Sequence, residues 1–405
     1  MTTHSGNGSI AKTRSVFWIF SLFVLAGIGG FLLLLSFRQY ERAWQIYLVN
    51  FLFWSAVAQG GLLFSMVMHI TKAGWSRALE NLSEAFVAFF PISFILFLIL
   101  FLGREHLFPW LHQDLHGKEV WLNLPFLFTR DFLGLLILYG SGFAYCHYAV
   151  KSKIHTDGGG LIRSVLKKTG VYRPEDREHY QRRMTVTAIV YMFAYAWVLT
   201  LISFDLVMSM DPHFISTLFG GYFFIKAFYI GLGGVIITAS VVSLAYGDDS
   251  QLKPAHFHDI GKLFFAFCVV WAYFLYAQVL VIWYGNVPED AHYLLNRFIS
   301  HPWKMLLAFI FVAAFVIPFL SLLNMKAKTR PKLMLVLCSL AMLGIWLDNL
   351  LLIGPPLEFD TSSLALQVFD LLISLGFLGL MVMAVAYFLQ LFPELVLKAD
   401  KKVSQ

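Results

Sequence analysis

Charged residues are scarce in this chain of 405 residues. Asp, Glu, Lys and Arg together make up 13% of the sequence, whereas soluble domains carry roughly 25%. A soluble protein of this length needs more charge to cover its surface, so the shortage excludes a water-soluble core. The net charge of +6 could indicate nucleic-acid binding, but the basic residues are distributed as in a membrane protein, and we expect no nucleic-acid partner.

Cysteine and histidine are also too few and too scattered for a redox centre. The three cysteines, Cys146, Cys268 and Cys338, form no CxxC pair, which excludes a zinc finger, an iron–sulfur cluster and a covalently attached haem. A b-type haem needs two facing histidines, and only His69 and His147 lie near apolar stretches, both at the same edge. We therefore expect no metal site and no covalently bound cofactor.

Apolar residues, in contrast, fill most of the chain. They make up 59% of it and form stretches of about 20 residues, the length that crosses a bilayer as a helix. The sequence therefore predicts an all-α integral membrane protein, with spans two to five and six to nine as two four-helix bundles and the first and last spans peripheral. The ten predicted spans are 15–37, 46–68, 82–103, 128–150, 185–208, 215–243, 259–283, 303–324, 331–352 and 363–391.

The basic residues predict the orientation of these spans. Of the 30 Lys and Arg residues, 22 lie at one end of the spans together with both chain termini, seven lie at the other end, and Lys226 lies inside a span. Because cytoplasmic loops are enriched in Lys and Arg, this bias places both termini in the cytoplasm. We expect a single multi-pass domain, 1–405.

Four of the predicted connections are long: 104–127, 151–184, 244–258 and 284–302. Residues 104–127 face the periplasm and carry His106, His112 and His116, whose spacing is more typical of a solvated or partner-facing loop than of a metal site. Residues 151–184 face the cytoplasm and contain a dense basic run, which we expect to lie against anionic lipid headgroups or a partner.

A few ionisable residues lie inside the apolar spans, where each charge costs roughly 3 kcal/mol on insertion scales. Lys226 falls near the midplane of span six, and a charge there needs a partner. The candidate partners are three acids from other spans. The depths predicted from the topology place Asp205, Asp348 and Asp370 in the outer half and Glu84 at the inner end of span three.

These residues leave three interpretations open. Chains of buried acids and bases carry protons in membrane pumps, and the candidates for such a route are Asp205, Lys226, Asp348, Asp370 and Glu84. A quinone could instead contact the outer polar residues Asp205, Gln278 and Asp348. The third interpretation is that paired charges only fix the register of the helices.

Several long segments resemble a known family. They include NFLFWSAVAQGGLLFSMVMHITKAGW (50–75), WLNLPFLFTR (121–130), FDLVMSMDPHFISTLFGGYFF (204–224), HDIGKLFFAFCVVWAYFLYAQVLVIWYGNVPED (258–290) and WLDNLLLIGPP (346–356). Together they resemble the F subunits of alternative complex III, which are ten-helix proteins of the NrfD/polysulfide-reductase membrane-anchor type. The resemblance runs from span two to span ten, and is weaker in the 151–184 loop and the C-terminal tail.

The resemblance implies a subunit of a quinol:cytochrome c, or quinol:terminal oxidase, oxidoreductase of respiratory or photosynthetic electron transport. It implies that this chain holds no cofactor, with quinone or quinol as the one candidate ligand. It also implies partners: subunits with c-type haems, an iron–sulfur subunit and a sister ten-helix subunit that binds quinol. The role implied for this chain is proton transfer, quinone proximity or scaffolding.

Two alternatives remain from the residues themselves. A secondary transporter also uses charges at the midplane, but it would need discontinuous helices at matching positions in two halves. An enzyme acting alone would need a nucleophile with its base or a cluster of metal ligands, and the sequence offers neither. We therefore predict no catalytic residue in this chain.

Overall fold

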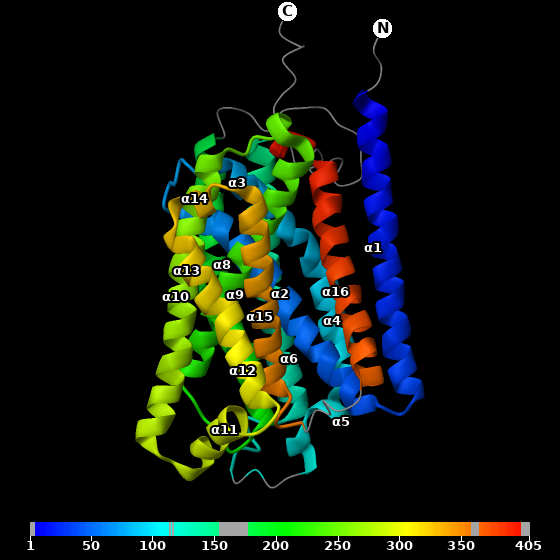
Figure 1. The fold of residues 1–405 in the computed structure, drawn as a ribbon, viewed down its shortest axis with the longest axis vertical. Coiled ribbons are helices and arrows are strands. Elements are labelled where there is room, and N and C mark those ends of the chain that lie inside the picture. Colours follow the sequence, from blue (N-terminus) through cyan, green and yellow to red (C-terminus); the bar gives the residue numbers. More distant parts are fainter. Residues whose placement is uncertain (1–4, 113–114, 116, 154–176, 358–363, 398–405) are drawn as a thin grey trace, which may run out of the picture.

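The structure, a computed structural model, describes residues 5–112, 115, 117–153, 177–357 and 364–397. Throughout this part of the chain the protein is helical and contains no strand (Figure 1). Ten helices or helical runs within it are long and apolar enough to cross a membrane. The protein is an all-α multi-pass membrane bundle, as the sequence predicts.

The ten spans agree with the predicted ones in number and order, but most of the helices are longer. Spans three and eight are runs of several helical segments, and α11 lies between spans seven and eight. The bounds are α1 Ser5–Ser36, α2 Tyr40–Ile70, α3 Arg77–Ser83, a 3-10 segment Glu84–Phe89, α4 Phe90–Leu100, α5 Arg104–Leu107, α6 Leu124–Lys153, α8 Arg177–Leu206, α9 Leu218–Tyr246, α10 Pro254–Gly285, α11 Pro288–Phe298, α12 Trp303–Phe311, a π-helical segment Val312–Val316, α13 Ile317–Leu323, α14 Met325–Lys328, α15 Pro331–Ile353 and α16 Leu364–Leu391.

The helices form two four-helix bundles and a peripheral pair. In the first bundle α2, the α3–α5 run, α6 and α8 pack in a closed ring, and in the second α9, α10, the α12–α13 run and α15 do the same. Helices α2 and α9 lie at the centre and pack against each other. Helix α1 packs along α16 beside the first bundle (Figure 1). The grouping predicted from the sequence is confirmed.

The start of α1 and the end of α16 lie at the same end of the molecule, next to α3 and α14, whereas α5 and α11 lie at the opposite end (Figure 1). This arrangement follows from an even number of crossings. The α3 and α14 end is the one that the charge bias predicts to be cytoplasmic, and the α5 and α11 end is called the outer end below.

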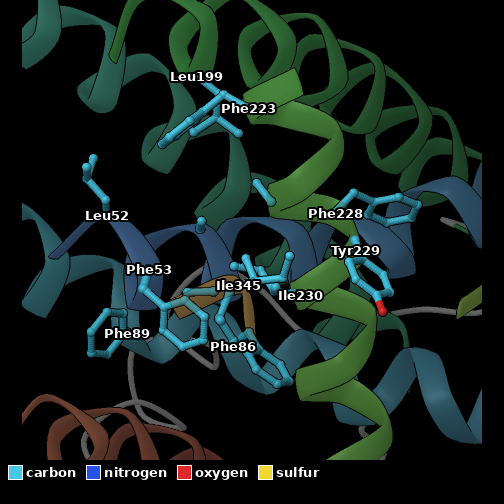
Figure 2. Close-up of a cluster of buried hydrophobic side chains, with 14 of the residues drawn as sticks. Leu52, Phe53, Phe86, Phe89, Leu199, Phe223, Phe228, Tyr229, Ile230 and Ile345 are labelled. Atoms are coloured by element: carbon cyan, nitrogen blue, oxygen red, sulfur yellow. The ribbon is translucent and has the colours of Figure 1, made fainter. Parts of the chain in front are cut away.

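Backbone contact between two glycines allows the central helices to cross. A Cβ atom on Gly231 of α9 would lie 2.3 Å from the carbonyl carbon of Gly60 on α2, and one on Gly60 would lie 2.2 Å from the carbonyl oxygen of Ala227. Large apolar side chains, including Phe53, Phe86 and Ile230, surround this crossing (Figure 2). Small residues permit such close approach between membrane helices.

Pro318 lies beside an irregular part of span eight. The five residues Val312–Val316 just before it form a π-helical segment. Proline has no N–H, so it cannot donate to the carbonyl of Ala314 four residues earlier. The Tyr229 hydroxyl on α9 donates to that oxygen instead, at 2.8 Å. A tyrosine from the neighbouring helix thus satisfies the carbonyl that proline leaves without its usual donor.

Two of the long connections, 104–127 and 151–184, are shorter than the sequence predicts. Helix α6 extends to Lys153 and α8 begins at Arg177, so both edges of the 151–184 segment are helical, and residues 154–176 lie outside the described part of the chain. The 104–127 segment contains α5 and a 3-10 turn, Pro109–His112, before α6 begins at Leu124. The helices extend beyond the apolar part of each span, because the polar residues at their ends continue the helical hydrogen bonding.

Candidate functional site

Each candidate charge from the sequence pairs with an oppositely charged residue on another helix. Asp348 pairs with Lys226, and this pair lies between α9 and α15 in the second bundle. The expectation that Asp205 and Asp370 also serve as partners of Lys226 is wrong, because each of them has an arginine of its own. The other three pairs are Arg130–Asp205, Arg42–Asp370 and Lys153–Glu84.

The Lys226–Asp348 pair is the most deeply buried of the four. Lys226 Nζ donates to Asp348 Oδ2 at 2.9 Å and to Asn349 Oδ1 at 2.8 Å. The Tyr222 hydroxyl, one turn before Lys226 on α9, donates to the same carboxylate oxygen at 2.7 Å. The rings of Tyr222 and Phe223 flank the ammonium group. The charges are therefore satisfied by short polar contacts inside an apolar shell.

A small cavity lies on the outer side of this pair. Its volume is about 50 Å³, and its polar lining comes from four elements: Tyr222 on α9, Gln278 on α10, Arg297 on α11 and Asp348 on α15. Ligand pockets usually measure roughly 300–1,000 Å³, so a quinone headgroup does not fit this cavity. Of the three quinone candidates, the structure brings Gln278 and Asp348 together here, but Asp205 does not line the cavity.

Arg297 closes the outer side of the cavity and was not identified from the sequence. Its guanidinium donates to the carbonyls of Tyr293 at 2.9 Å and Leu352 at 2.8 Å, and it lies 3.5 Å from the centre of the Tyr293 ring. Burial lowers the pKa of Arg297 and raises the pKa of Tyr293. The sequence placed both residues in a connection, although their spacing of four on an amphipathic segment indicates one face of a helix.

Asp205 belongs to a separate cluster at the outer end of the first bundle. Arg130 on α6 donates through Nε and Nη2 to both carboxylate oxygens of Asp205 on α8, and it stacks on Trp121 at 3.9 Å. The next residue, Asp131, is fully buried beside Asp205, and neither of its oxygens has a hydrogen-bond partner among the described residues. Asp131 was not among the residues identified from the sequence.

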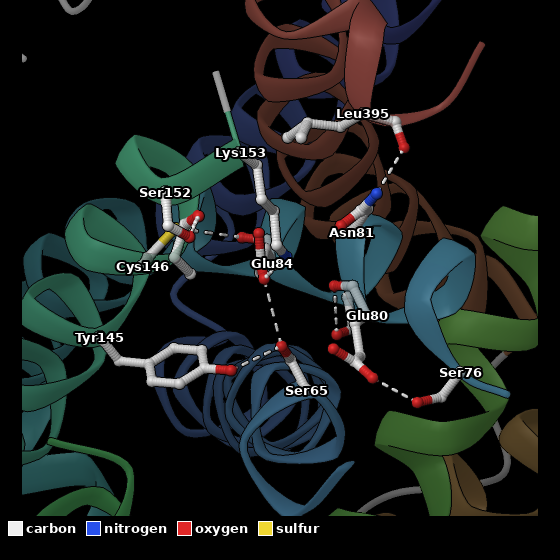
Figure 3. Close-up of polar contacts among 12 residues, drawn as sticks. Ser65, Ser76, Glu80, Asn81, Glu84, Tyr145, Cys146, Ser152, Lys153 and Leu395 are labelled. Carbon is white, nitrogen blue, oxygen red and sulfur yellow. Dashed lines mark hydrogen bonds and ion pairs between the residues drawn. The ribbon is translucent and has the colours of Figure 1, made fainter. Parts of the chain in front are cut away.

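Glu84 lies at the inner end of the first bundle. Its Oε1 accepts from Lys153 Nζ at 2.5 Å and from the Ser65 hydroxyl at 3.3 Å, and Ser65 is 3.0 Å from the Tyr145 hydroxyl (Figure 3). The Glu84 side chain is fully buried, whereas that of Lys153 is 26% exposed. Lys153 therefore links a buried carboxylate to the inner surface.

A chain of hydroxyl groups lies deeper in the first bundle, and sequence reasoning missed it. Ser55 on α2 lies 2.6 Å from Ser93 on α4, Ser93 lies 2.7 Å from the Tyr139 hydroxyl on α6, and Gln59 on α2 donates to Tyr139 at 2.9 Å. Gln59 directly precedes Gly60 at the helix crossing. The available signal was the i,i+4 spacing of Ser55 and Gln59, which places them on one face of α2.

Asp370 is part of a tie between helices rather than part of the central cluster. Arg42 on α2 donates to it through two nitrogens, at 3.1 Å from Nε and 2.6 Å from Nη2. Such two-point pairs fix geometry as well as charge. This pair joins α16 to α2 near the outer end, which matches the interpretation that a charge sets helix register.

The outer histidines contribute no described metal site. His106 stacks on Tyr40, with 5.2 Å between ring centres, and the side chains of His112 and His116 lie outside the described part of the chain. Within the part that the structure describes, no three potential ligand side chains come together. Comparison with known proteins adds no assignment: no family model matches the chain, and no curated protein matches it.

Proposed function

We propose that this chain is a membrane subunit of a quinol-oxidising electron-transport complex and that its buried charges take part in proton transfer. The resemblance to the F subunits of alternative complex III supports the first half of this proposal. The Lys226–Asp348 pair supports the second half, and it is the single observation on which the proton role depends. A cofactor-free chain in such a complex acts with its partners and is not catalytic alone.

The position of the polar groups favours proton transfer over a purely structural role. Lys226 and Asp348 have polar neighbours on their outer side in Tyr222 and Gln278. Toward the inner surface, the hydroxyl chain around Tyr139 and the Glu84–Lys153 pair occupy the first bundle. An ion pair that only ties two helices together, such as Arg42–Asp370, needs no such polar neighbours. Buried ionisable groups with polar neighbours mark proton paths in membrane proteins.

Quinone oxidation itself belongs, in this proposal, to the sister ten-helix subunit. The cavity beside Asp348 measures about 50 Å³ and is far smaller than a site for a ring with substituents. The partners proposed for this chain are that sister subunit, the iron–sulfur subunit and the c-type haem subunits. The proposed location is a bacterial inner membrane, with both termini in the cytoplasm.

A secondary transporter is the second candidate, and the helices weigh against it. Helix α9 is continuous through Gly231, Gly233 and Gly234, where a discontinuous helix would be needed beside Lys226. The irregular segments, Glu84–Phe89 and Val312–Val316, lie in spans three and eight. These are the second member of one bundle and the third member of the other, so they do not occupy matching positions.

Affinity purification of this chain from its native membrane in mild detergent tests the proposal. Mass spectrometry and a reduced-minus-oxidised spectrum of the purified material identify what accompanies the chain. We expect an iron–sulfur protein, a second ten-helix subunit and a c-type haem signal. A colourless chain purified without partners would contradict the proposal and favour the transporter.

A further inference from the structure

The cavity beside Asp348 contains polar atoms that nothing in the described protein satisfies. Both the amide nitrogen and the amide oxygen of Gln278 are buried without a hydrogen-bond partner, and so is Nε of Arg297. Arg297 is 4% exposed, and it lines the same cavity as Gln278 and Asp348. Leaving such groups buried and unsatisfied is destabilising, so a structure that retains them needs a ligand for them.

Both the size and the chemistry of the cavity fit water. A bound water needs roughly 10–15 Å³ of accessible volume and two to four polar partners. The cavity volume of about 50 Å³ therefore accommodates a cluster of a few molecules. The lining offers donors from Arg297 and Gln278 and acceptors from Gln278 and Asp348, which is the mixture that water, with its own donors and acceptors, can satisfy.

Helix α11 separates this cavity from the outer surface. Tyr293 and Arg297 face inward, whereas Leu295 and Ile299 are exposed on the opposite face. Two contacts hold the helix in place: the ring of Tyr293 stacks on Phe214 at 3.7 Å between centres, and Asp290 accepts from the backbone N–H of Ile215 at 3.4 Å. Helix α11 therefore covers the cavity on the side of the outer end.

We propose that the cavity is a binding site for a small cluster of ordered water that hydrates Asp348 beneath α11. The cluster is hydrogen-bonded to Gln278, to Nε of Arg297 and to the Asp348 carboxylate. The cluster also supplies the contact through which the Lys226–Asp348 pair exchanges protons with the outer side, and this second step rests on the proposed proton role. The existence of the water site itself does not depend on that role.

X-ray radiolytic footprinting with mass spectrometry tests the site in the full chain, embedded in lipid nanodiscs. Radicals formed from bound water oxidise adjacent side chains even where bulk solvent is excluded. We expect Tyr222 and Tyr293 to be oxidised several-fold faster than Tyr195 and Tyr47, which are buried to the same degree but donate directly to backbone carbonyls. Equal, slow oxidation of all four tyrosines would overturn the proposal.

A variant separates bound water from chance reactivity. Gln278→Met keeps the volume of the side chain but removes both amide atoms, so oxidation of Tyr222 should fall toward the rate of Tyr195. Gln251→Met, at a glutamine outside the cavity, is the control and should leave that rate unchanged. An unchanged Tyr222 rate in Gln278→Met would count against the site. Footprinting needs neither electron transfer nor partner subunits, so its failure and the failure of the proposed function are distinguishable.

Discussion

Lys226 and Asp348, 122 residues apart in the chain, form an ion pair of 2.9 Å between α9 and α15. Both side chains are almost completely buried, and together they leave no net charge. In a medium that solvates charge poorly, neither partner can be removed without stranding the other. This relationship gives the pair a structural role in addition to any role in proton transfer, and the two roles can be separated by experiment.

Loss of one member of the pair should destabilise the protein more than loss of both. We expect Asp348→Leu to lower the free energy of unfolding by about 3 kcal/mol or more, because Lys226 is left buried and unpaired. The double variant Lys226→Met with Asp348→Leu should recover most of that loss. Thermal unfolding of the purified protein measures both, and a double variant no more stable than the single one would contradict this view of the pair.

The helix crossing at Gly60 and Gly231 should tolerate no side chain. We expect Gly231→Ala to lower the yield of folded protein and its unfolding temperature, because the new Cβ would meet backbone atoms that cannot rotate away. Gly140→Ala is the matched control: Gly140 also lies within a membrane helix, and a Cβ there meets nothing within 4 Å. Replacing a helical glycine by alanine in open space is stabilising by up to about 1 kcal/mol. Similar losses at both positions would argue against the crossing.

The contact between Tyr229 and the Ala314 carbonyl predicts a coupled pair of substitutions. Tyr229→Phe removes the shorter of two hydrogen bonds to this carbonyl, which also accepts from the Cys268 thiol at 3.5 Å, and should destabilise the protein by about 1 kcal/mol. Pro318→Ala supplies a backbone N–H in the same turn, so the Tyr229→Phe substitution should be less damaging in that background. A double-mutant cycle of unfolding free energies measures the coupling, and strictly additive effects would refute it.

The Arg42–Asp370 pair should matter for assembly of the peripheral helices and not for proton transfer. We expect Asp370→Ala to loosen the attachment of α16 to α2, since Arg42 loses both of its contacts with the carboxylate. Limited proteolysis near the outer, N-terminal end of α16 should then become faster, whereas cleavage elsewhere should not. Uniformly faster cleavage across the whole chain would indicate a global loss of stability and contradict a local tie.

The sequence predicted the number of spans, their order and their grouping, because hydrophobic length and charge bias are properties of local sequence. It could not predict which charges meet. Asp205, Asp348 and Asp370 have similar predicted depths, and the choice among them as partner of Lys226 depends on which helix packs beside α9. Asp131 and Arg297 were missed for the same reason: both lie at the edge of apolar sequence, and only tertiary packing buries them.

The π-helical segment before Pro318 shows a second limit of sequence analysis. Proline signals a local disturbance, but the partner that satisfies the freed carbonyl, Tyr229, comes from another span. Likewise the hydroxyl chain from Ser55 to Tyr139 joins three helices. Serine hydroxyls in a membrane helix often bond within their own helix, so the sequence does not show which helices they join.

The number of protons translocated per electron in the reconstituted complex is the most direct test of the central claim. The charge-neutral double variant Lys226→Met with Asp348→Leu is compared with a matched variant, Arg42→Met with Asp370→Leu, in proteoliposomes oxidising quinol. We predict that the first variant still oxidises quinol but moves fewer protons per electron, while the second keeps the wild-type ratio. An unchanged ratio in the first variant, with the complex fully assembled, would contradict a proton role for the Lys226–Asp348 pair.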